Sequence, residues 1–378
     1  MISLATGVSF KDCTINKMKN IRPIAFYLPQ FHPIPENDAW WGKGFTEWRN
    51  VTKAKPRFNN HYQPHLPADL GFYDLRLIEI MEEQAAMAKG HGIYGFIYYH
   101  YWFNGKQVLE HPVNNMIAEK KPDFPFMLCW ANENWSRNWD GGFDKLLLNQ
   151  EYSFEDDRLH MDYLCKNIFS DSRYIKIDNK PVFAVYKTEL FPDPEVTAAI
   201  WNEVCVKVGF NGIYLLKVES LSDRKAPNDI GFDAAVEFQP EWINLPPMLQ
   251  PGLNEKILHR LKIKQTPKYS NRIFEYGDLV QKAIQKKPAA YKRYPGLTPG
   301  WDNTARRNTG AHIFKDSTPE LYGEWLSHIV HHFKPFSEEE NFIFINAWNE
   351  WAEGNHLEPC QKWGKQYLVA TKKAVSNA

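Results

Sequence analysis

Long apolar runs are missing from this sequence, and their absence limits where the protein can reside. No stretch approaches the ~18 consecutive apolar residues of a membrane-spanning helix, and residues 1–20 lack the apolar segment of a signal peptide. The five cysteines are widely spaced and contain no Cys-x-x-Cys pair, so we interpret them as reduced core thiols. We therefore expect a cytoplasmic protein without a transmembrane segment.

An excess of either charge is also missing. Lys plus Arg and Asp plus Glu both number 45, so no overall field attracts nucleic acid, and we expect no nucleic-acid partner. The one local asymmetry is the stretch 251–293, where eleven basic residues face Glu255, Glu275 and Asp278. We interpret this basic stretch, within an insertion spanning about 241–293, as a solvated surface rather than a phosphate-binding one.

Aromatic residues, in contrast, are abundant. They make up 15% of the chain, with 14 Trp, 18 Tyr and 24 Phe. Aromatic rings bury a large area in any core, but indoles beside polar loop residues also stack on the faces of sugars. The composition is therefore compatible with a carbohydrate ligand.

Short apolar runs alternate with stretches of helical periodicity, the pattern of a parallel sheet with crossover helices. The expected helices cover about 75–89, 155–169, 195–208, 319–332 and a stretch after Trp363. We predict eight strands at 24–28, 93–99, 126–130, 182–186, 213–218, 234–238, 294–300 and 342–347. Eight strands predict an α/β fold, a (β/α)8 TIM barrel with elaborated βα-loops. We expect residues 1–20 to be an extension and residues 21–378 to form one catalytic domain.

Polar and aromatic side chains follow several predicted strands where they end. In a barrel all the carboxyl ends of the strands lie on one face, so these segments should converge on one pocket. We expect the substrate-binding residues to be Gln30, His32, Glu47, Trp48, His100, Trp102, Asn132, Glu133, Trp135, Glu237, Trp301 and Asn349. In particular, we predict that Trp102, Glu133, Trp135 and Trp301 lie with Glu350 around one cavity.

Two carboxylates stand three residues apart just beyond the last predicted strand, in Asn349-Glu350-Trp351-Ala352-Glu353-Gly354. On a helical turn such residues share one face. Glycosidic hydrolysis needs a proton donor and a second carboxylate. Two carboxylates only three residues apart in the chain cannot easily reach opposite faces of a sugar ring, as direct displacement by one of them requires. Either Glu133 or Glu237 is the partner, or a neighbouring 2-hydroxyl of the sugar is the nucleophile.

Four motifs together resemble the WbsX-like family. They are Tyr-Leu-Pro-Gln-Phe-His at 27–32, Trp-Trp-Gly-Lys-Gly-Phe-Thr-Glu-Trp at 40–48, Trp-Ala-Asn-Glu-Asn-Trp-Ser at 130–136 with Trp-Asp-Gly at 139–141, and the Asn-Glu-Trp-Ala-Glu-Gly segment at 349–354. The resemblance covers about 22–368. That family is labelled a glycosyltransferase of surface-polysaccharide (O-antigen) biosynthesis and is related to glycoside hydrolase family 99, the endo-α-mannosidases.

This resemblance implies a (β/α)8 barrel and retaining chemistry through a 1,2-anhydro-sugar. It makes Glu350 the base acting on the 2-hydroxyl and Glu353 the general acid/base. Outside the motif at 349–354 the sugar-binding residues of the mannosidases cannot be aligned with this chain. Mannose specificity is therefore not implied.

Several other chemistries lack their motifs. The Gly-x-Gly-x-x-Gly at 90–95 follows a predicted helix and opens a strand, the reverse of the dinucleotide-binding order. No Asp-x-Asp, Gly-x-Ser-x-Gly or Walker A sequence occurs, and the histidine pairs lack metal-ligand spacing. We expect no metal and no cofactor.

Three functions remain open: a glycoside hydrolase, a glycosyltransferase of O-antigen or other surface polysaccharide, and a non-catalytic carbohydrate-binding barrel. The glutamate pair favours catalysis, because a binding site needs stacking and hydrogen bonds but no acid/base pair. We expect an oligosaccharide or polysaccharide substrate, with a lipid-linked or nucleotide-linked donor as an alternative.

Overall fold

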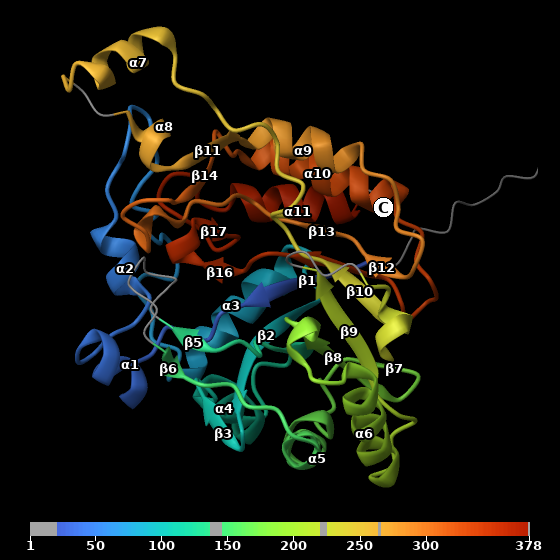
Figure 1. The fold of residues 1–378 in the computed structure, drawn as a ribbon. Helices are drawn as coiled ribbons and strands as arrows, with labels where there is room; N and C mark the ends of the chain where they lie inside the picture. Colours follow the sequence, from blue (N-terminus) through green and yellow to red (C-terminus); the bar gives the residue numbers. More distant parts are fainter. Residues whose placement is uncertain (1–20, 137–145, 220–224, 264–265, 377–378) are drawn as a thin grey trace, which may run out of the picture.

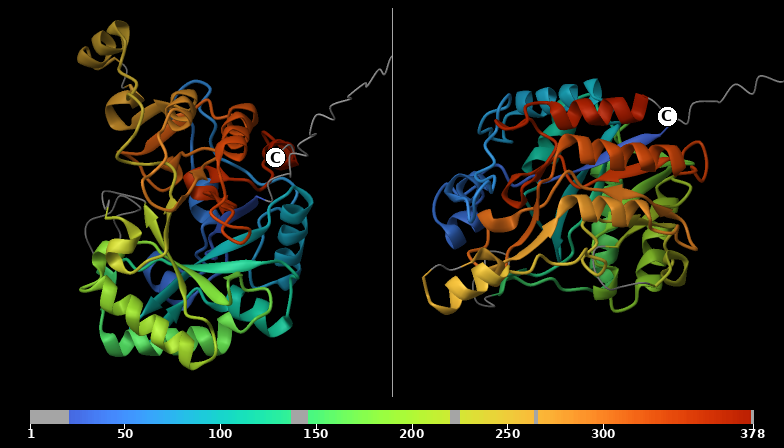
Figure 2. Two further views of the ribbon diagram at one scale, coloured as in Figure 1. Left: turned by 90° about the vertical axis from the view of Figure 1, so that its right-hand side faces the viewer. Right: turned by 90° about the horizontal axis from the view of Figure 1, so that it is seen from above.

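The computed structural model describes residues 21–136, 146–219, 225–263 and 266–376. Its core is a nearly closed ring of parallel strands with helices around it, the predicted (β/α)8 architecture (Figures 1 and 2). The strands are β1 (Arg22–Tyr27), β2 (Gly95–Phe103), β4 (Phe126–Trp130), β8 (Lys180–Val185), β9 (Tyr214–Glu219), β10 (Ala234–Glu237), β12 (Arg293–Tyr294), β13 (Gly296–Leu297) and β15 (Phe342–Ile345). Residues 1–20, the expected extension, lie outside the described residues.

The ring closes through the segment predicted as the strand at 294–300. The hydrogen-bonded order runs from β12 through β10, β9, β8, β4, β2, β1 and β15 to β13. Its two end strands are separated in the chain only by Pro295, so β12 and β13 together act as the seventh barrel strand. A Cβ atom on Gly296 would lie 1.7 Å from the backbone oxygen of Glu237. Glycine thus lets β13 approach the end of β10.

The outer helices are α3 (Ile78–Gly90), α4 (His111–Glu119), α5 (Phe154–Leu164) with a π-helical continuation at Cys165–Phe169, α6 (Pro194–Lys207), α9 (Tyr276–Ile284), α10 (Pro319–His332) and α11 (Gln366–Ser376). Between β9 and β10 the described residues contain a 3-10 turn at Pro227–Ile230. Ser153, Asp193 and Thr318 cap α5, α6 and α10 through their side chains. No helix within the described residues is long and apolar enough to cross a bilayer.

The helix expected from about residue 75 begins three residues later, at Ile78, and its N-cap is Leu77. Asp74, a residue type that often caps a helix, does not cap this one. The Asp74 carboxylate instead accepts hydrogen bonds from the backbone and side chain of Arg76. Leu75 donates its backbone N–H to Phe31, which holds this segment in a turn. A tertiary contact therefore displaces the local capping preference.

Long loops follow several strands on one side of the barrel. They carry α1 (Pro35–Trp41), α2 (Trp48–Lys53), β5 (Trp135–Ser136), β6 (Leu146–Leu148), α7 (Leu253–Arg260), α8 (Pro267–Ser270), β11 (Arg272–Glu275) and β14 (His312–Lys315). In Figure 1 these elements lie mainly on the left, the side toward which β1 points. Strands β11 and β14 pair in parallel as a separate small sheet. The described cysteines, Cys129, Cys165, Cys205 and Cys360, are buried free thiols, as predicted, and Cys13 lies outside the described residues.

We predict that Gly296→Ala destabilises the protein strongly, lowering the free energy of unfolding by more than about 3 kcal/mol, because the added methyl group collides with the Glu237 carbonyl. Chemical denaturation followed by circular dichroism measures this loss. Gly90→Ala is the matched control, since a Cβ there meets no atom within 4 Å. Equal stability of the two variants would contradict the tight closure at β13.

Candidate active site

The sequence segment with the two glutamates forms a hairpin after the last barrel strand. Strands β16 (Asn349–Glu350) and β17 (Asn355–His356) pair antiparallel, and a 3-10 turn at Trp351–Glu353 joins them. Glu350 ends β16 and directly precedes the turn, and Glu353 is the last residue of the turn. The helical turn expected to carry both glutamates is therefore a 3-10 turn that begins one residue after Glu350.

Gly354 ends this turn in a conformation that favours glycine. Its φ is +58°, and a Cβ atom there would lie 3.0 Å from the Asp302 side chain. The backbone N–H of Asp302 also donates to the backbone carbonyl oxygen of Glu353 at 2.6 Å. The loop after β13 is therefore packed directly against the turn that carries the glutamate pair.

A buried guanidinium holds three carboxylates at the centre of the site. The Nη1 atom of Arg306 donates to Glu353 at 2.6 Å, and its Nη2 lies 3.3 Å from Glu350. Glu47 lies 3.2 Å from the same guanidinium, and its side chain has no exposed surface. Glu47, Arg306 and the Glu350/Glu353 pair follow β1, β13 and β15, which are adjacent in the ring. We call these four residues the carboxylate cluster.

The cluster contains more negative than positive charge, and this sets its protonation. Burial, followed by repulsion from Glu353, raises the pKa of Glu350 to about 8, against the opposing effect of Arg306. Burial also raises the pKa of Glu353. The two groups titrate as a coupled pair. Glu353 receives the shorter bond from Arg306, so a proton shared by the free pair resides mainly on Glu350.

A further buried carboxylate, outside the carboxylate cluster, anchors the hairpin. Glu358 accepts hydrogen bonds from Trp351 Nε1 at 2.6 Å, Gln84 Nε2 at 2.6 Å and the Tyr73 hydroxyl at 2.8 Å. Burial raises the pKa of Glu358 to about 7. Asn349 exchanges two hydrogen bonds with the backbone of Leu28 at the end of β1. These contacts fix the glutamate pair relative to the barrel.

Aromatic side chains border the cluster on one side. Burial, followed by the charge of nearby Glu350, raises the pKa of the Tyr101 hydroxyl. The Tyr101 ring contacts Trp135 with centroids 5.2 Å apart, and Trp135 contacts Trp40 at 5.7 Å. Trp135, a predicted binding residue, is therefore linked to the cluster through Tyr101. Tyr101 and Trp40 were not among the predicted residues.

Several other predicted binding residues face the protein interior. Trp48 donates its indole N–H to the Tyr73 backbone and packs against Trp351. His100 contacts His160 through ring nitrogens 2.9 Å apart, and burial lowers the pKa of His100 to about 3. Trp102 stacks on His160 and donates to Asp156.

The remaining predicted residues are spread over neighbouring strand ends. Asn132 forms two hydrogen bonds with the Lys187 backbone, and Glu133 lies 3.8 Å from the Lys187 ammonium. Glu237 pairs with Lys286 at 2.6 Å. Gln30 and His32 are buried, and burial lowers the pKa of His32 to about 4. The binding role of each residue stays a prediction.

A cavity of about 760 Å³ lies beside the carboxylate cluster and does not coincide with it. Trp301 and Asp302 line it, whereas Trp102, Glu133, Trp135 and Glu350 are not among its described lining residues. This cavity therefore does not gather the residues expected around one pocket. The carboxylate cluster, and not this cavity, contains the buried glutamate pair.

Sequence reasoning missed Arg306 and did not assign Glu47 to the carboxylate cluster. Glu47 belongs to the motif at 40–48, but nothing in that motif marks it as a partner of the two later glutamates, and Arg306 lies outside all four motifs. One physical signal was available: three buried carboxylates require a nearby cation. The sequence alone does not tell which of many arginines supplies it. The Trp-Asp-Gly motif at 139–141 lies outside the described residues.

A family model described as "Glycosyltransferase WbsX" matches residues 23–371. Two curated relatives from strains of Xanthomonas campestris pv. campestris, both described as "Uncharacterized protein WxcX", are 43% and 42% identical over 356 residues. The match covers 94% of this chain and 50% of each relative. The chain thus spans about half the length of these relatives.

Solved structures share the fold at low sequence identity. One described as "Glycoside hydrolase-like protein" has a TM-score of 0.60 and 14% identity, covering 98% of this chain and 97% of its own. A GH99 endo-alpha-mannosidase from Bacteroides thetaiotaomicron gives 0.57 and 16%, covering 94% and 96%. A second structure of that enzyme gives 0.54 and 15%, covering 94% and 97%. At such identities the likeness establishes the fold.

We predict that Glu350→Gln raises the melting temperature increasingly with pH, by roughly 1–3 °C at pH 9. The raised pKa of about 8 means that the folded state binds this proton more tightly than the unfolded state, whose value is near 4.5. The contribution of the Glu350 proton to the free energy of unfolding is therefore fully present below pH 4.5 and is lost as the pH rises through 8. The amide mimics the protonated form and escapes this loss.

Differential scanning fluorimetry from pH 5 to 9 measures this effect. Glu203→Gln serves as the control, because Lys207 lowers the pKa of this exposed carboxylate. Its melting temperature relative to the wild type should not increase toward high pH. A Glu350→Gln protein no more stable than the wild type at pH 9 would show that Glu350 is ionised at little cost in the folded protein.

Proposed function

The chain belongs to the family described as Glycosyltransferase WbsX, and on that premise we propose that it cleaves or transfers glycosidic bonds with retention of configuration. The observation that carries this proposal is the Glu350/Glu353 pair, which is buried around Arg306 at the start and the end of the hairpin turn. Burial raises the pKa of both carboxyls into or toward the range of a general acid. The substrate is an oligosaccharide or polysaccharide.

The first step uses both carboxyls and the 2-hydroxyl of the sugar. Glu350 takes the 2-hydroxyl proton, and the oxygen attacks the anomeric carbon while the bond to the leaving oxygen breaks. Glu353 gives its proton to that leaving oxygen, so a 1,2-anhydro-sugar forms. In the second step Glu353 deprotonates the incoming hydroxyl, which opens the ring as Glu350 returns its proton. Two inversions give net retention.

These roles require a proton shift within the pair. In the free enzyme the proton resides mainly on Glu350, whereas the first step needs it on Glu353. A sugar 2-hydroxyl that donates to Glu350 stabilises the ionised form of that carboxylate. The proton then passes to Glu353 when the substrate binds. Arg306 remains between the two groups and limits the total negative charge of the cluster.

The same machinery supports hydrolysis and transfer, because the second step accepts a hydroxyl from water or from another sugar. The family description names a glycosyltransferase and so favours transfer. For this alternative we propose surface-polysaccharide biosynthesis from a lipid-linked or nucleotide-linked donor. If the enzyme is such a transferase, we propose that it acts in the cytoplasm. A non-catalytic binding barrel is less favoured, because a binding site has no need of two buried carboxyls with raised pKa values.

We predict that Glu350→Gln and Glu353→Gln each lower turnover on a natural-type oligosaccharide by at least ~10²-fold. The two variants should differ on an aryl glycoside with a dinitrophenolate leaving group. That group departs without a proton, so the first step of Glu353→Gln recovers, seen as a burst of released phenolate. Glu350→Gln shows no burst because the 2-hydroxyl lacks its base. If each variant loses the same activity on both substrates, the assignment of Glu350 as base and Glu353 as acid is wrong.

We also predict full activity after exhaustive chelation, since the two carboxyls and the sugar provide acid, base and nucleophile. The assay supplies an α-manno-configured panel of aryl, oligosaccharide and nucleotide-linked donors. It measures free sugar against sugar transferred to a hydroxyl acceptor. An absolute requirement for a divalent ion together with a nucleotide-sugar would contradict the mechanism and favour a conventional transferase.

A further inference from the structure

The 760 Å³ cavity lies behind the catalytic hairpin and between loops that are far apart in the sequence. Its walls come from the segment 57–65, the insertion carrying α7 and α8, the strand β14 and the segment after β17. In Figure 1 the insertion stands above the blue segment that follows α2, at the upper left. A volume of about 300–1,000 Å³ is typical of a small-molecule site.

The lining of this cavity combines aromatic rings with paired charges. Lys268 binds Glu255 at 2.8 Å, and Lys315 binds Glu275 at 2.8 Å. Four Lys/Arg and four Asp/Glu side chains are among the described lining residues, so no excess charge remains for a phosphate. The aromatic lining residues are Phe58, Tyr62, Trp301, Phe314, Trp363 and Tyr367. Aromatic rings with hydrogen-bonding groups suit an uncharged sugar.

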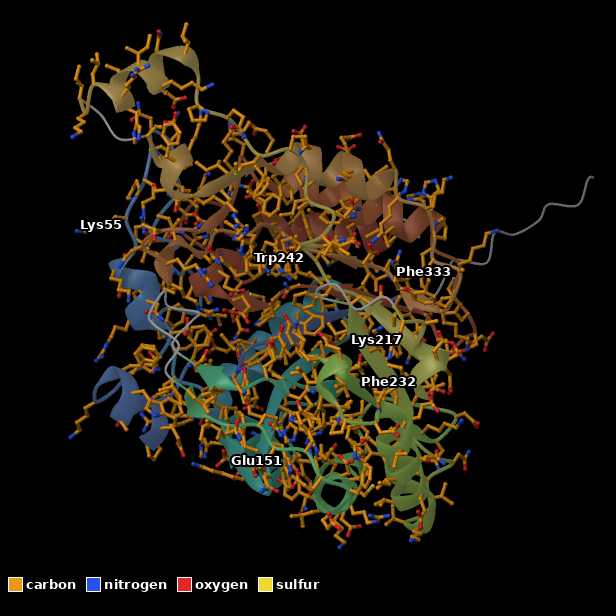
Figure 3. The ribbon with its side chains drawn as sticks, in the orientation of Figure 1. Lys55, Glu151, Lys217, Phe232, Trp242 and Phe333 are labelled. Carbon is orange, nitrogen blue, oxygen red and sulfur yellow. The ribbon has the colours of Figure 1, made fainter. Side chains whose placement is uncertain are left out.

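Two residues that line the cavity carry a buried polar atom without a hydrogen-bond partner among the described residues: the Tyr62 hydroxyl and the Trp301 indole N–H. Trp301 is only 7% exposed, yet its indole N–H has no hydrogen-bond acceptor among the described residues. Trp242, labelled in Figure 3, packs edge to face against this ring with centroids 5.0 Å apart and holds its orientation. An unsatisfied buried donor is costly unless a ligand supplies the acceptor. A sugar hydroxyl is such an acceptor.

A thin wall separates this cavity from the carboxylate cluster. Asp302 and Gly354 line the cavity, and both belong to the packed contact that supports Glu353. The Asp302 carboxylate is fixed by His61 Nε2 at 2.6 Å, by Gln63 Nε2 at 2.9 Å and by Thr304. An occupant would therefore lie behind the wall, out of direct reach of the glutamate pair.

We propose that this cavity is a second sugar-binding site for an uncharged oligosaccharide segment. In this site Trp301 donates its indole N–H to a hydroxyl oxygen of the sugar. The choice of a sugar rests on the proposed function, but binding here does not require catalysis. The site holds a part of the glycan remote from the bond that reacts. It would thereby raise the affinity for long chains over short ones.

The test is two-dimensional NMR of the 15N-labelled indole groups, with Trp301→Phe used to assign the Trp301 signal. The probes are methyl α-mannoside, methyl α-glucoside, methyl β-galactoside and α-mannotriose, each titrated into the full chain. At least one sugar should shift the Trp301 signal saturably. Its dissociation constant, read from the Trp363 signal, should rise about three- to tenfold in Trp301→Phe.

Trp201 provides the matched control, because its indole N–H is also unpartnered among the described residues. Its ring packs against Trp130, Phe183 and Phe191, outside the cavity. Its signal should stay unchanged, and Trp201→Phe should bind the sugar as the wild type does. Inorganic phosphate should shift neither signal. A response to phosphate alone, or to none of the sugars, would overturn the proposal.

A variant with both Glu350→Gln and Glu353→Gln separates this proposal from the proposed function. The Trp301 shift should persist in that variant with an unchanged dissociation constant, even though turnover is lost. If the double substitution abolishes the shift, the sugar binds at the carboxylate cluster and the second site is wrong. If the shift persists while no glycosidic activity is found in the wild type, the binding site stands and the proposed function fails.

Discussion

The guanidinium of Arg306 is the constraint on which the rest of the site depends. Glu47, Glu350 and Glu353 could not share one buried volume as anions without a cation between them. Arg306 neutralises part of that charge, while burial and mutual repulsion keep one proton on the glutamate pair. A pair with one proton is the state from which one carboxyl acts as base and the other as acid.

The barrel supplies the precision that this arrangement needs. The cluster is assembled from loops after β1, β13 and β15, three neighbouring strands, so their relative positions are fixed by sheet hydrogen bonds. Ring closure depends on Gly296, which places β13 and the Arg306 loop that follows it. Glu358 ties the hairpin to α3 through Gln84. Substitutions remote from the glutamates can therefore disturb the chemistry.

Asp302 and Gly354 lie between the carboxylate cluster and the cavity, which differ in the side chains that line them. On one side the carboxylate cluster holds a dense set of charges, and on the other the cavity presents aromatic rings and paired ions. Asp302 donates its backbone N–H to Glu353 and precedes Arg306 by four residues. The segment that leads to Arg306 therefore forms part of the cavity wall and also contacts the turn that carries Glu353.

The sequence by itself determined the architecture and pointed to the glutamate pair, whose catalytic role stays a proposal. Apolar periodicity located β4 and α10 at their observed bounds, because buried strands and amphipathic helices carry their pattern locally. The motif at 349–354 identified Glu350 and Glu353. Tertiary structure alone decided that Arg306 completes their site, that Trp48 and Asn349 face inward, and that Trp301 lines a separate cavity. Charge pairing and side-chain direction arise between distant segments, so no local pattern records them.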